Sequence, residues 1–418
     1  MRSPHSPGSL ALLWDESHLW GAMYLRALES LDTPFFLLRT RDVANGELRR
    51  LRPQALIVPG GWASRKARSL GLRGREELRS FVSRGGLYLG FCGGAGLALR
   101  GSEPGAGLEL CSWSRKPMEQ RLPNCSGHMQ ISRHLPSPYA PGVEQNLQAP
   151  VWWPSQFQPQ PLLGPRVLAT YRGPGEDFWV GDTPLSGLKK TDLNELERAY
   201  GINLDPEWLK REPAMIHGNF GQGSYLLTYL HLETPNSPAA NRWLARILAS
   251  AGAEPGQARA VPEWELSVPS CLWRDQGLLY AKRSLEELVT LGEEHFVLGW
   301  RKPWLLGWRR GLPGFALNSL LALVCSVLER EPTPEAQKHW RENRKDFLAV
   351  LEEFTAGYTE LVRAAGRIQA LGSPDRAKRP AEEMQTRKKR LVGPFPGQEG
   401  VYAELAGMLQ ELLAKQAP

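Results

Sequence analysis

The chain has 418 residues, of which 42% are hydrophobic, enough to bury the cores of two or three domains. Its formal net charge of +7 permits weak attraction to anionic surfaces, but no recognised nucleic-acid motif accompanies it. Five widely spaced cysteines without a Cys-x-x-Cys pair argue against a disulfide framework and a zinc site. We therefore expect a soluble protein in a reducing compartment, without a metal or other cofactor.

The N-terminal half alternates apolar runs with helical stretches. We expect strands at residues 10–14, 35–38, 56–58 and 87–91, and helices at 19–31 and 75–83. This alternation predicts βαβ units and a parallel sheet covered by helices on both faces. The apolar start is broken at Asp15 and Glu16, too early for a signal peptide, so a cytoplasmic location is expected.

Cys92 lies at the end of the fourth expected strand, in the segment Gly-Leu-Tyr-Leu-Gly-Phe-Cys-Gly-Gly-Ala-Gly of residues 86–96. A residue between glycines at a strand-to-helix corner is typical of a nucleophile elbow, because the sharp turn lifts the side chain clear of the sheet. The alternative is a cysteine buried only for packing. Other segments must decide between the two.

A Pro-Gly-Gly turn that contains Gly60 and Gly61 follows the third expected strand. Glycines there would let backbone N–H groups turn toward a developing oxyanion, together with the amide of Gly93 after the cysteine. An ordinary turn is the alternative. Because parallel strands present reactive groups at their carboxyl ends, this turn and Cys92 are expected at one site.

A later segment, residues 223–235, supplies a candidate base. Because side chains alternate along a strand, His231 and Glu233 are expected on one face, where the carboxylate can orient the imidazole. His231 alone could simply end a core strand. Taken together with the glycine turn and Cys92, the segment predicts a Cys92-His231-Glu233 triad.

In this order, the three segments resemble the class I glutamine amidotransferase superfamily, and within it the amidotransferase-like domain at the N-terminus of biotin-protein ligases. The resemblance rests on residues 58–61, 81–95 and 221–231 and covers about residues 8–252. It implies a flavodoxin-like parallel sheet and catalytic roles for the triad. It also implies an oxyanion hole at Gly60, Gly61 and Gly93.

Two departures limit what the resemblance implies. Glutaminases of the superfamily usually carry Gln four residues after the nucleophile, where this chain has Gly96, which argues against glutamine hydrolysis. The usual His-Pro-Glu is His231-Leu232-Glu233 here, which keeps both polar residues. No adenylate-binding motif of a biotin ligase catalytic domain is found, so a complete biotin ligase is not expected.

Proline and glycine are dense in residues 101–213, which predicts an insertion of short antiparallel strands and loops into the first domain. Cys125, His128 and His134 lie there without metal-ligand spacing and are interpreted as satisfied polar or loop residues. Trp152, Trp153 and Trp179 are interpreted as core residues, with a cleft lining as the alternative, and Asp177 and Asp182 as turn residues.

We expect the α/β domain at residues 1–253, a linker at 254–270 and an α-helical domain at 271–418. A helix capped by Ser237 and stopped at Gly252 should close the first domain. In the second, a helix starting at Thr333 and Pro334 carries an apolar seam, followed by a helix from residue 401. The seam residues are Trp340, Phe347, Leu351, Phe354, Tyr358, Leu361, Ala365 and Ile368.

The helical domain leaves its partners open. Its seams must bury against an intrachain bundle, a homodimer or a partner protein. The basic segment 376–390 is interpreted as a solvated linker, so nucleic acid is an unlikely partner on this reading. The uncharged stretch 311–328 contains Pro313, Gly314 and Asn318, which favours a buried helix over membrane attachment.

Two functions follow as hypotheses. The first is a cysteine-dependent amidohydrolase or acyl-transfer protein acting on a small-molecule or peptide amide through Cys92, His231 and Glu233. The second is a catalytically inactive amidotransferase-like module that binds or regulates through its helical domain. Gly96 favours the second, and the presence of all three triad residue types favours the first.

Overall fold

The computed structural model describes residues 10–417 except 102–105, 134–136, 140–146, 161–163, 257–259, 372–373 and 395–396. The chain forms two compact units, Met1–Pro262 and Glu263–Pro418, and the first holds all the site residues named above. The division falls inside the predicted linker. Val261 in the first unit and Trp264 in the second are both buried.

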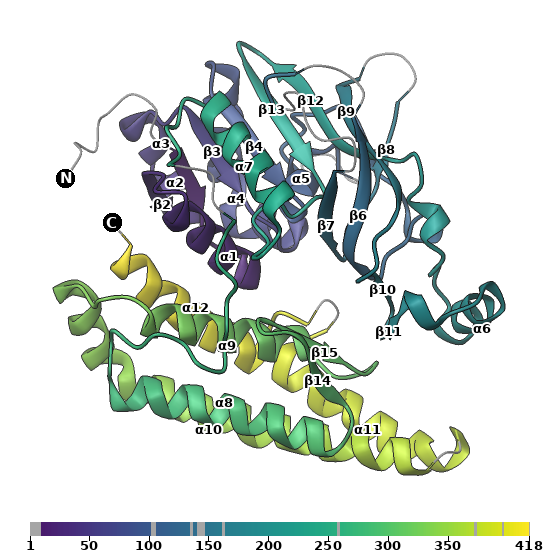
Figure 1. Ribbon diagram of the computed structural model, residues 1–418. Helices are drawn as coiled ribbons and strands as arrows, with labels where there is room; N and C mark the ends of the chain where they lie inside the picture. The colour runs from purple at the N-terminus through teal and green to yellow at the C-terminus, as the bar shows by residue number, and fades with distance from the viewer. Residues whose placement is uncertain are drawn as a thin grey trace. The chain divides into compact units, whose positions relative to one another are not determined.

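A parallel sheet forms the core of the first unit (Figure 1). Its strands are β1 (Leu10–Leu13), β2 (Phe35–Leu38), β3 (Ala55–Val58), β4 (Leu87–Phe91) and β13 (Gly223–Thr228). They lie in the order β2-β1-β3-β4-β13, every neighbouring pair parallel. This is the flavodoxin-like strand order, so the predicted α/β class and parallel sheet are confirmed for this part.

Helices cover both faces of the parallel strands, as the sequence predicted. They are α1 (His18–Ser30), α2 (Thr40–Ala44), α3 (Glu47–Leu51), α4 (Ala63–Ser83), α5 (Gly93–Ala98) and α7 (Pro238–Ser250). Residues of α4 and α5 share a core with Tyr88. On α1, the Tyr24 ring lies 5.0 Å from Phe91, which points to the opposite face because side chains alternate along β4.

Antiparallel strands extend the same sheet beyond β13, where the insertion was predicted. They are β12 (Pro213–Phe220), β9 (Arg166–Pro174), β6 (Cys125–Arg133), β7 (Gln148–Trp152), β10 (Trp179–Val180) and β11 (Thr183–Pro184). A small separate pair is made by β5 (Ser114–Arg115) and β8 (Phe157–Gln158), and the helix α6 (Lys190–Tyr200) follows β11 in the chain. Short 3₁₀ helices among the described residues occupy Met118–Gln120, Leu185–Gly187 and Pro206–Trp208.

The second unit is mainly helical. Its helices are α8 (Gln276–Glu294), α9 (Gly314–Leu328), α10 (Pro334–Leu371), α11 (Pro374–Val392) and α12 (Gly400–Gln416). Helix α10, which carries the predicted apolar seam, packs against α8, α11 and α12 of the same chain. Of the three partners considered for the seam, this is the intrachain bundle. Ala365 and Ile368, at the end of the predicted seam, are only partly buried.

Two interpretations of the second unit were wrong. The basic segment 376–390 is not a linker but belongs to α11, where Arg387 and Arg390 pair with Glu360 and Glu353 on α10. A hairpin of β14 (Leu298–Lys302) and β15 (Leu305–Trp308) was also missed. It is held by buried Asn318 on α9, which bonds the backbone of Trp304 and Leu306.

The apolar stretch at 311–328 forms α9, which is almost entirely buried. Its one amide side chain, Asn318, is satisfied by the backbone of the hairpin, as a buried amide requires. Among the described residues, no helix combines the length and apolar character needed to cross a membrane.

Candidate active site

Cys92 lies at the corner between β4 and α5. Its backbone has φ +49° and ψ −107°, a conformation that L residues adopt only when the surrounding structure holds it. That support is visible, because its N–H donates to the Thr228 carbonyl at 2.8 Å and its own carbonyl accepts from Gly96 at 3.0 Å. With 9% exposure, the residue is nearly buried. The chain therefore fixes one cysteine, in a strained turn, at the carboxyl end of the parallel strands.

Two glycines after Cys92 let the corner approach the turn that follows β3. The Gly94 N–H donates to the Pro59 carbonyl at 3.1 Å. A Cβ atom on Gly94 would overlap the Val58 carbonyl oxygen, and one on Gly93 would overlap that of Gly61. Only glycine fits at such backbone contacts. The Gly60-Gly61 turn and the Cys92 corner are thus in direct contact.

His231 and Glu233 form a hydrogen-bonded pair, but not for the reason the sequence pattern gave. The strand β13 ends at Thr228, so both residues lie in the turn after it and not on one strand face. The Nδ1 atom of His231 lies 2.7 Å from Oε1 of Glu233, and both side chains are fully buried. Alternation along a strand therefore did not bring them together.

The turn that carries this pair is itself held by buried polar contacts. The His231 N–H donates to the Pro150 carbonyl at 2.9 Å, and the Thr234 hydroxyl donates to the His231 carbonyl at 2.8 Å. Asn241 on α7 donates its side-chain amide to the carbonyls of Leu232 and Thr234 at 2.8 and 2.9 Å. The ring of His231 is therefore positioned by backbone that has little freedom to move.

The imidazole lies beside the Gly60-Gly61 turn and the Cys92 sulfur. A Cβ on Gly60 would come within 3.1 Å of His231 Cε1, and the Trp20 ring packs 4.5 Å from the imidazole centroid. Burial lowers the pKa of His231, but the Glu233 carboxylate and the Cys92 sulfur outweigh it and raise the pKa to about 10. The ring is therefore expected to be protonated at neutral pH.

The Cys92 sulfur is near enough to raise the pKa of the His231 ring, but the two side chains do not form a hydrogen bond. Among the described residues, Nε2 of His231 has no partner in hydrogen-bonding geometry. Catalytic hydrogen bonds often tighten only when substrate is bound, so this geometry is compatible with proton transfer. The structure thus brings Cys92, His231 and Glu233 into one site.

Tyr24 on α1 is a further buried residue near Glu233 that the sequence did not single out. It is fully buried, and burial together with the Glu233 charge raises the pKa of its phenol. In the described part of the chain, its hydroxyl has no partner in hydrogen-bonding geometry. Tyr24 therefore places a neutral hydroxyl near the pair without adding charge.

Of the predicted oxyanion donors, Gly61 and Gly93 have the suitable features. Gly61 has φ +115°, and a side chain there would overlap the Glu16 carbonyl. Within the described part of the chain, neither the Gly61 nor the Gly93 N–H donates a hydrogen bond. Gly60 instead provides space, because a Cβ there would meet Trp20. Two backbone donors beside Cys92 are therefore unused.

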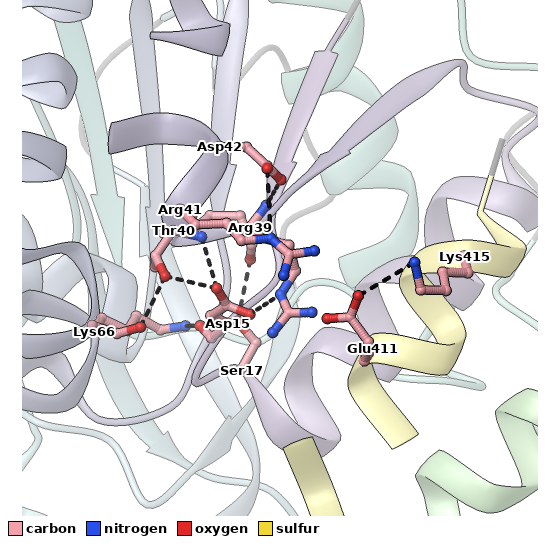
Figure 2. A network of polar contacts seen from close by, with 11 residues as sticks. Asp15, Ser17, Arg39, Thr40, Arg41, Asp42, Lys66, Glu411 and Lys415 are labelled. Carbon is pink, nitrogen blue, oxygen red and sulfur yellow. Dashed lines mark hydrogen bonds and ion pairs between the residues drawn. The ribbon is translucent and has the colours of Figure 1, made fainter. Parts of the chain in front are cut away.

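A buried lysine, Lys66 on α4, lies beneath this turn and was missed in the sequence. Its Nζ donates to the Asp15 carbonyl at 3.1 Å and to the Ser17 hydroxyl at 2.6 Å (Figure 2). Its Cε atom lies 3.3 Å from where a Gly61 side chain would begin. The residue lies among basic neighbours on α4, so nothing in the sequence marked it as the one that is 0% exposed.

The loop that receives Lys66 is tightly anchored. The Asp15 carboxylate accepts from the backbone N–H and hydroxyl of Thr40, each at 2.7 Å, and pairs with Arg39 (Figure 2). Glu16 in the same loop has φ +57°. Burial lowers the pKa of Lys66 to about 7, although Glu16, Asp15 and Cys92 oppose the shift. Lys66 therefore connects a strained loop to the site.

Replacing Lys66 with Met should change how stability depends on pH. From pH 7 to 10.5 the unfolded chain keeps the proton that the folded protein has released, so wild-type stability rises with pH through that window. Relative to Lys66→Met, we expect a gain of about 3 kcal/mol between pH 7 and pH 9.5, measured by urea unfolding at both pH values. Lys189→Met, at an exposed position, is the control. Parallel pH curves for wild type and Lys66→Met would contradict the account.

The tryptophans of the insertion divide between the predicted roles. Trp152 is buried and donates its indole N–H to the Thr234 hydroxyl at 2.9 Å, so it supports the turn of His231. Trp153 lies 6.0 Å from the Trp20 ring, which in turn contacts His231. Trp179 is partly buried on β10. His134 lies outside the described residues.

A family model of known proteins matches one segment of the chain that contains part of this site. Residues 47–103 match the family model "Biotin-protein ligase, N terminal". The predicted resemblance is thereby shown for this segment. It contains Lys66, both glycine turns and Cys92, and it ends before His231 and Glu233.

Solved structures also resemble the chain. PurLQS from Thermotoga maritima has TM-score 0.39 and 12% identity, covering 58% of this chain and 99% of that chain. A putative GMP synthase subunit from Thermoplasma acidophilum has TM-score 0.37 and 12% identity, covering 59% and 96%. A beta-galactosidase from Bacillus circulans sp. alkalophilus has TM-score 0.34 and 14% identity, covering 59% and 31%. The search of curated proteins found no match.

Gly96 lies where α5 approaches the start of α4. A Cβ there would lie 3.3 Å from Cβ of Ala63. A longer side chain would have to bend around Ala63, so helix packing limits the space at this position.

Proposed function

We propose that the chain is a cysteine-dependent amidohydrolase or acyl-transfer protein of the biotin-protein ligase N-terminal type, with Cys92, His231 and Glu233 as its catalytic residues. The observation that carries the proposal is the fully buried imidazole of His231, whose Nδ1 lies 2.7 Å from Oε1 of Glu233 and whose pKa is raised by that carboxylate and by the Cys92 sulfur. Burying a charged pair costs desolvation free energy, so a fully buried pair suggests a functional role. Perturbed groups of this kind concentrate at functional sites.

The raised pKa of His231 decides where the proton lies at the start of the proposed reaction. The ring already holds the proton at neutral pH, so the Cys92 sulfur attacks the carbonyl carbon of a substrate amide as a thiolate. The N–H groups of Gly61 and Gly93 receive the oxyanion. His231 then gives its proton to the leaving amine, and the carbon–nitrogen bond breaks to leave a thioester on Cys92.

Release of the acyl group follows the same path in reverse. Water adds to the thioester, His231 takes a proton from it, and the carbon–sulfur bond breaks to free a carboxylic acid and restore the thiolate. If an amine takes the place of water, the same steps transfer the acyl group. Glu233 keeps the ring in the orientation that both steps need.

L-Glutamine is not expected to be the substrate. The position that holds a substrate-binding glutamine in the resembled glutaminases is Gly96, where helix packing leaves little room for one. We therefore expect the wild-type protein to release ammonia from L-glutamine no faster than the Cys92→Ala variant does. Release at 10-fold or more above that background would contradict this part of the proposal.

The proposal is tested with a panel of small carboxamides and peptide amides. After an acid quench, peptide mapping should find an acyl adduct on Cys92 with at least one member, and released amine should be absent in Cys92→Ala. His231→Gln should lower the rate of adduct formation, while His217→Gln, a partly buried histidine on β12, should leave it unchanged. A full panel without adduct, with Cys92 no more reactive than buried Cys111 or Cys325, would favour the binding-module alternative instead.

A further inference from the structure

A second chain of hydrogen bonds in the first unit has the atom pattern of a nucleophilic triad. It joins His128 on β6, Asp177 in the turn between β9 and β10, and Ser237 just before α7. The Ser237 hydroxyl lies 3.0 Å from Nε2 of His128, and Nδ1 of the same ring lies 2.9 Å from Oδ2 of Asp177. None of the three belongs to the site of Cys92, and the sequence interpreted them as loop, turn and cap residues.

The partners fix the direction of each hydrogen bond. A carboxylate only accepts, so Nδ1 of His128 carries a hydrogen, and in the neutral ring this leaves the Nε2 lone pair facing Ser237. The hydroxyl of Ser237 therefore donates to Nε2, since its other acceptor, the Pro235 carbonyl, is farther away at 3.4 Å. This is the tautomer in which a histidine removes a proton from serine.

Backbone contacts hold the histidine and the carboxylate together. Asp177 also accepts the backbone N–H of His128 through Oδ1 at 2.8 Å, so both carboxylate oxygens bond one residue. The Gly175 N–H donates to the His128 carbonyl at 2.7 Å, and a Cβ on Gly127 would meet Phe178 Cα at 2.8 Å. The orienting group is thus fixed by the approach of two backbone segments.

Ser237 occupies the N-cap position of α7, but its side chain does not cap the helix. The hydroxyl bonds His128 instead, and Pro238 at the first helical position has no N–H to donate. Within the described residues, the N–H groups of Ala239 and Ala240 make no hydrogen bond. These donors and the positive end of the α7 dipole lie beside the hydroxyl, where an oxyanion would form.

From these contacts we propose that Ser237, His128 and Asp177 form a second nucleophilic site that accepts small uncharged carboxylic esters. Ser237 is 4% exposed and the His128 and Asp177 side chains are 21% and 31% exposed, which restricts the proposal to small substrates. The site works independently of Cys92, since it shares no side chain with it.

The steps balance with water as the second reactant. The Ser237 oxygen bonds the ester carbonyl carbon, its proton passes to Nε2 of His128, and the alcohol leaves with that proton as its carbon–oxygen bond breaks. Water then adds to the acyl-serine and gives a proton to His128. The carboxylic acid departs, and the proton returns to the Ser237 oxygen.

The test uses a small alkyl fluorophosphonate on the full chain, with the adduct located by peptide mapping. We expect the adduct on Ser237 in wild type and in Cys92→Ala at the same rate. Asp177→Asn keeps the size of the side chain but disfavours the required tautomer, so labelling should slow by about 100-fold or more. Asp182→Asn, in the neighbouring turn, is the matched control, and circular dichroism checks the fold of each variant.

Hydrolysis of 4-nitrophenyl acetate supplies a second reading. Turnover should be lost in Ser237→Ala and kept in Cys92→Ala. The proposal is overturned if no adduct forms on Ser237, if Asp177→Asn labels as fast as wild type, or if turnover depends on Cys92 and not on Ser237. Because the two sites give adducts on different peptides, failure of one proposal is distinguishable from failure of the other.

Discussion

His231→Gln should slow alkylation of Cys92 by iodoacetamide by about 30-fold at pH 6. The raised pKa of His231 gives the imidazole a positive charge beside the sulfur at that pH, and glutamine carries no such charge. A positive charge beside a cysteine sulfur makes it react faster with an alkylating reagent. Glutamine keeps a polar side chain of similar length, so the fold should survive the change.

Peptide mapping of the same samples provides the controls. Cys271, which is partly exposed in the second unit, should react equally fast in both proteins. His217→Gln should alter neither rate. If Cys92 reacts in His231→Gln as fast as in wild type, the imidazole does not activate the sulfur.

Gly94→Ala should destabilise the protein by more than about 3 kcal/mol. A Cβ there overlaps the Val58 carbonyl oxygen, and the backbone cannot yield because the Gly94 N–H bonds Pro59 at 3.1 Å. For a unit of this size the melting temperature should fall by about 6 to 12 °C. Thermal unfolding followed by circular dichroism measures the effect.

Gly96→Ala, two residues later in α5, is the matched control. Its nearest contact would be Ala63 Cβ at 3.3 Å, which needs a small shift, and the change gains about 1 kcal/mol of helix propensity. We expect its stability to lie within about 1 kcal/mol of wild type. Equal losses in both variants would mean that the close backbone contact at Gly94 is not what the corner requires.

Much of the parallel sheet was predictable because its strands are short, continuous apolar runs. The expected strands at residues 35–38 and 87–91 coincide with β2 and β4, and the helix at 19–31 is α1 within one residue. Helix α4 was predicted only in its second half. Its first turns are rich in charge, and Gly71 interrupts the helix with φ +61°.

The site was predictable where local geometry alone determines it. Cys92 between glycines requires a positive φ and a close approach, and both follow from the residue types. Lys66 was not predictable, because its burial depends on a loop 51 residues earlier in the chain. The Ser237-His128 contact spans 109 residues and has the same kind of cause.

The helical unit shows why charge patterns mislead. A run of lysine and arginine at 376–390 has the composition of a solvated linker, yet α11 is a helix whose arginines pair with glutamates on α10. The pairing is invisible in sequence because Glu353 and Arg390 are 37 residues apart. The apolar seam of α10 was easier to predict, because the spacing of its apolar residues can be seen within one stretch of sequence.

The central claim is that His231 holds a proton between the Cys92 sulfur and the Glu233 carboxylate, and a ¹⁵N NMR titration of the imidazole tests it most directly. In wild type we expect the ring to remain protonated through neutral pH and to titrate near pH 10. In Glu233→Gln its pKa should fall by several units, because burial then acts without the opposing carboxylate. A wild-type ring that is already neutral at pH 7.5 would contradict the account.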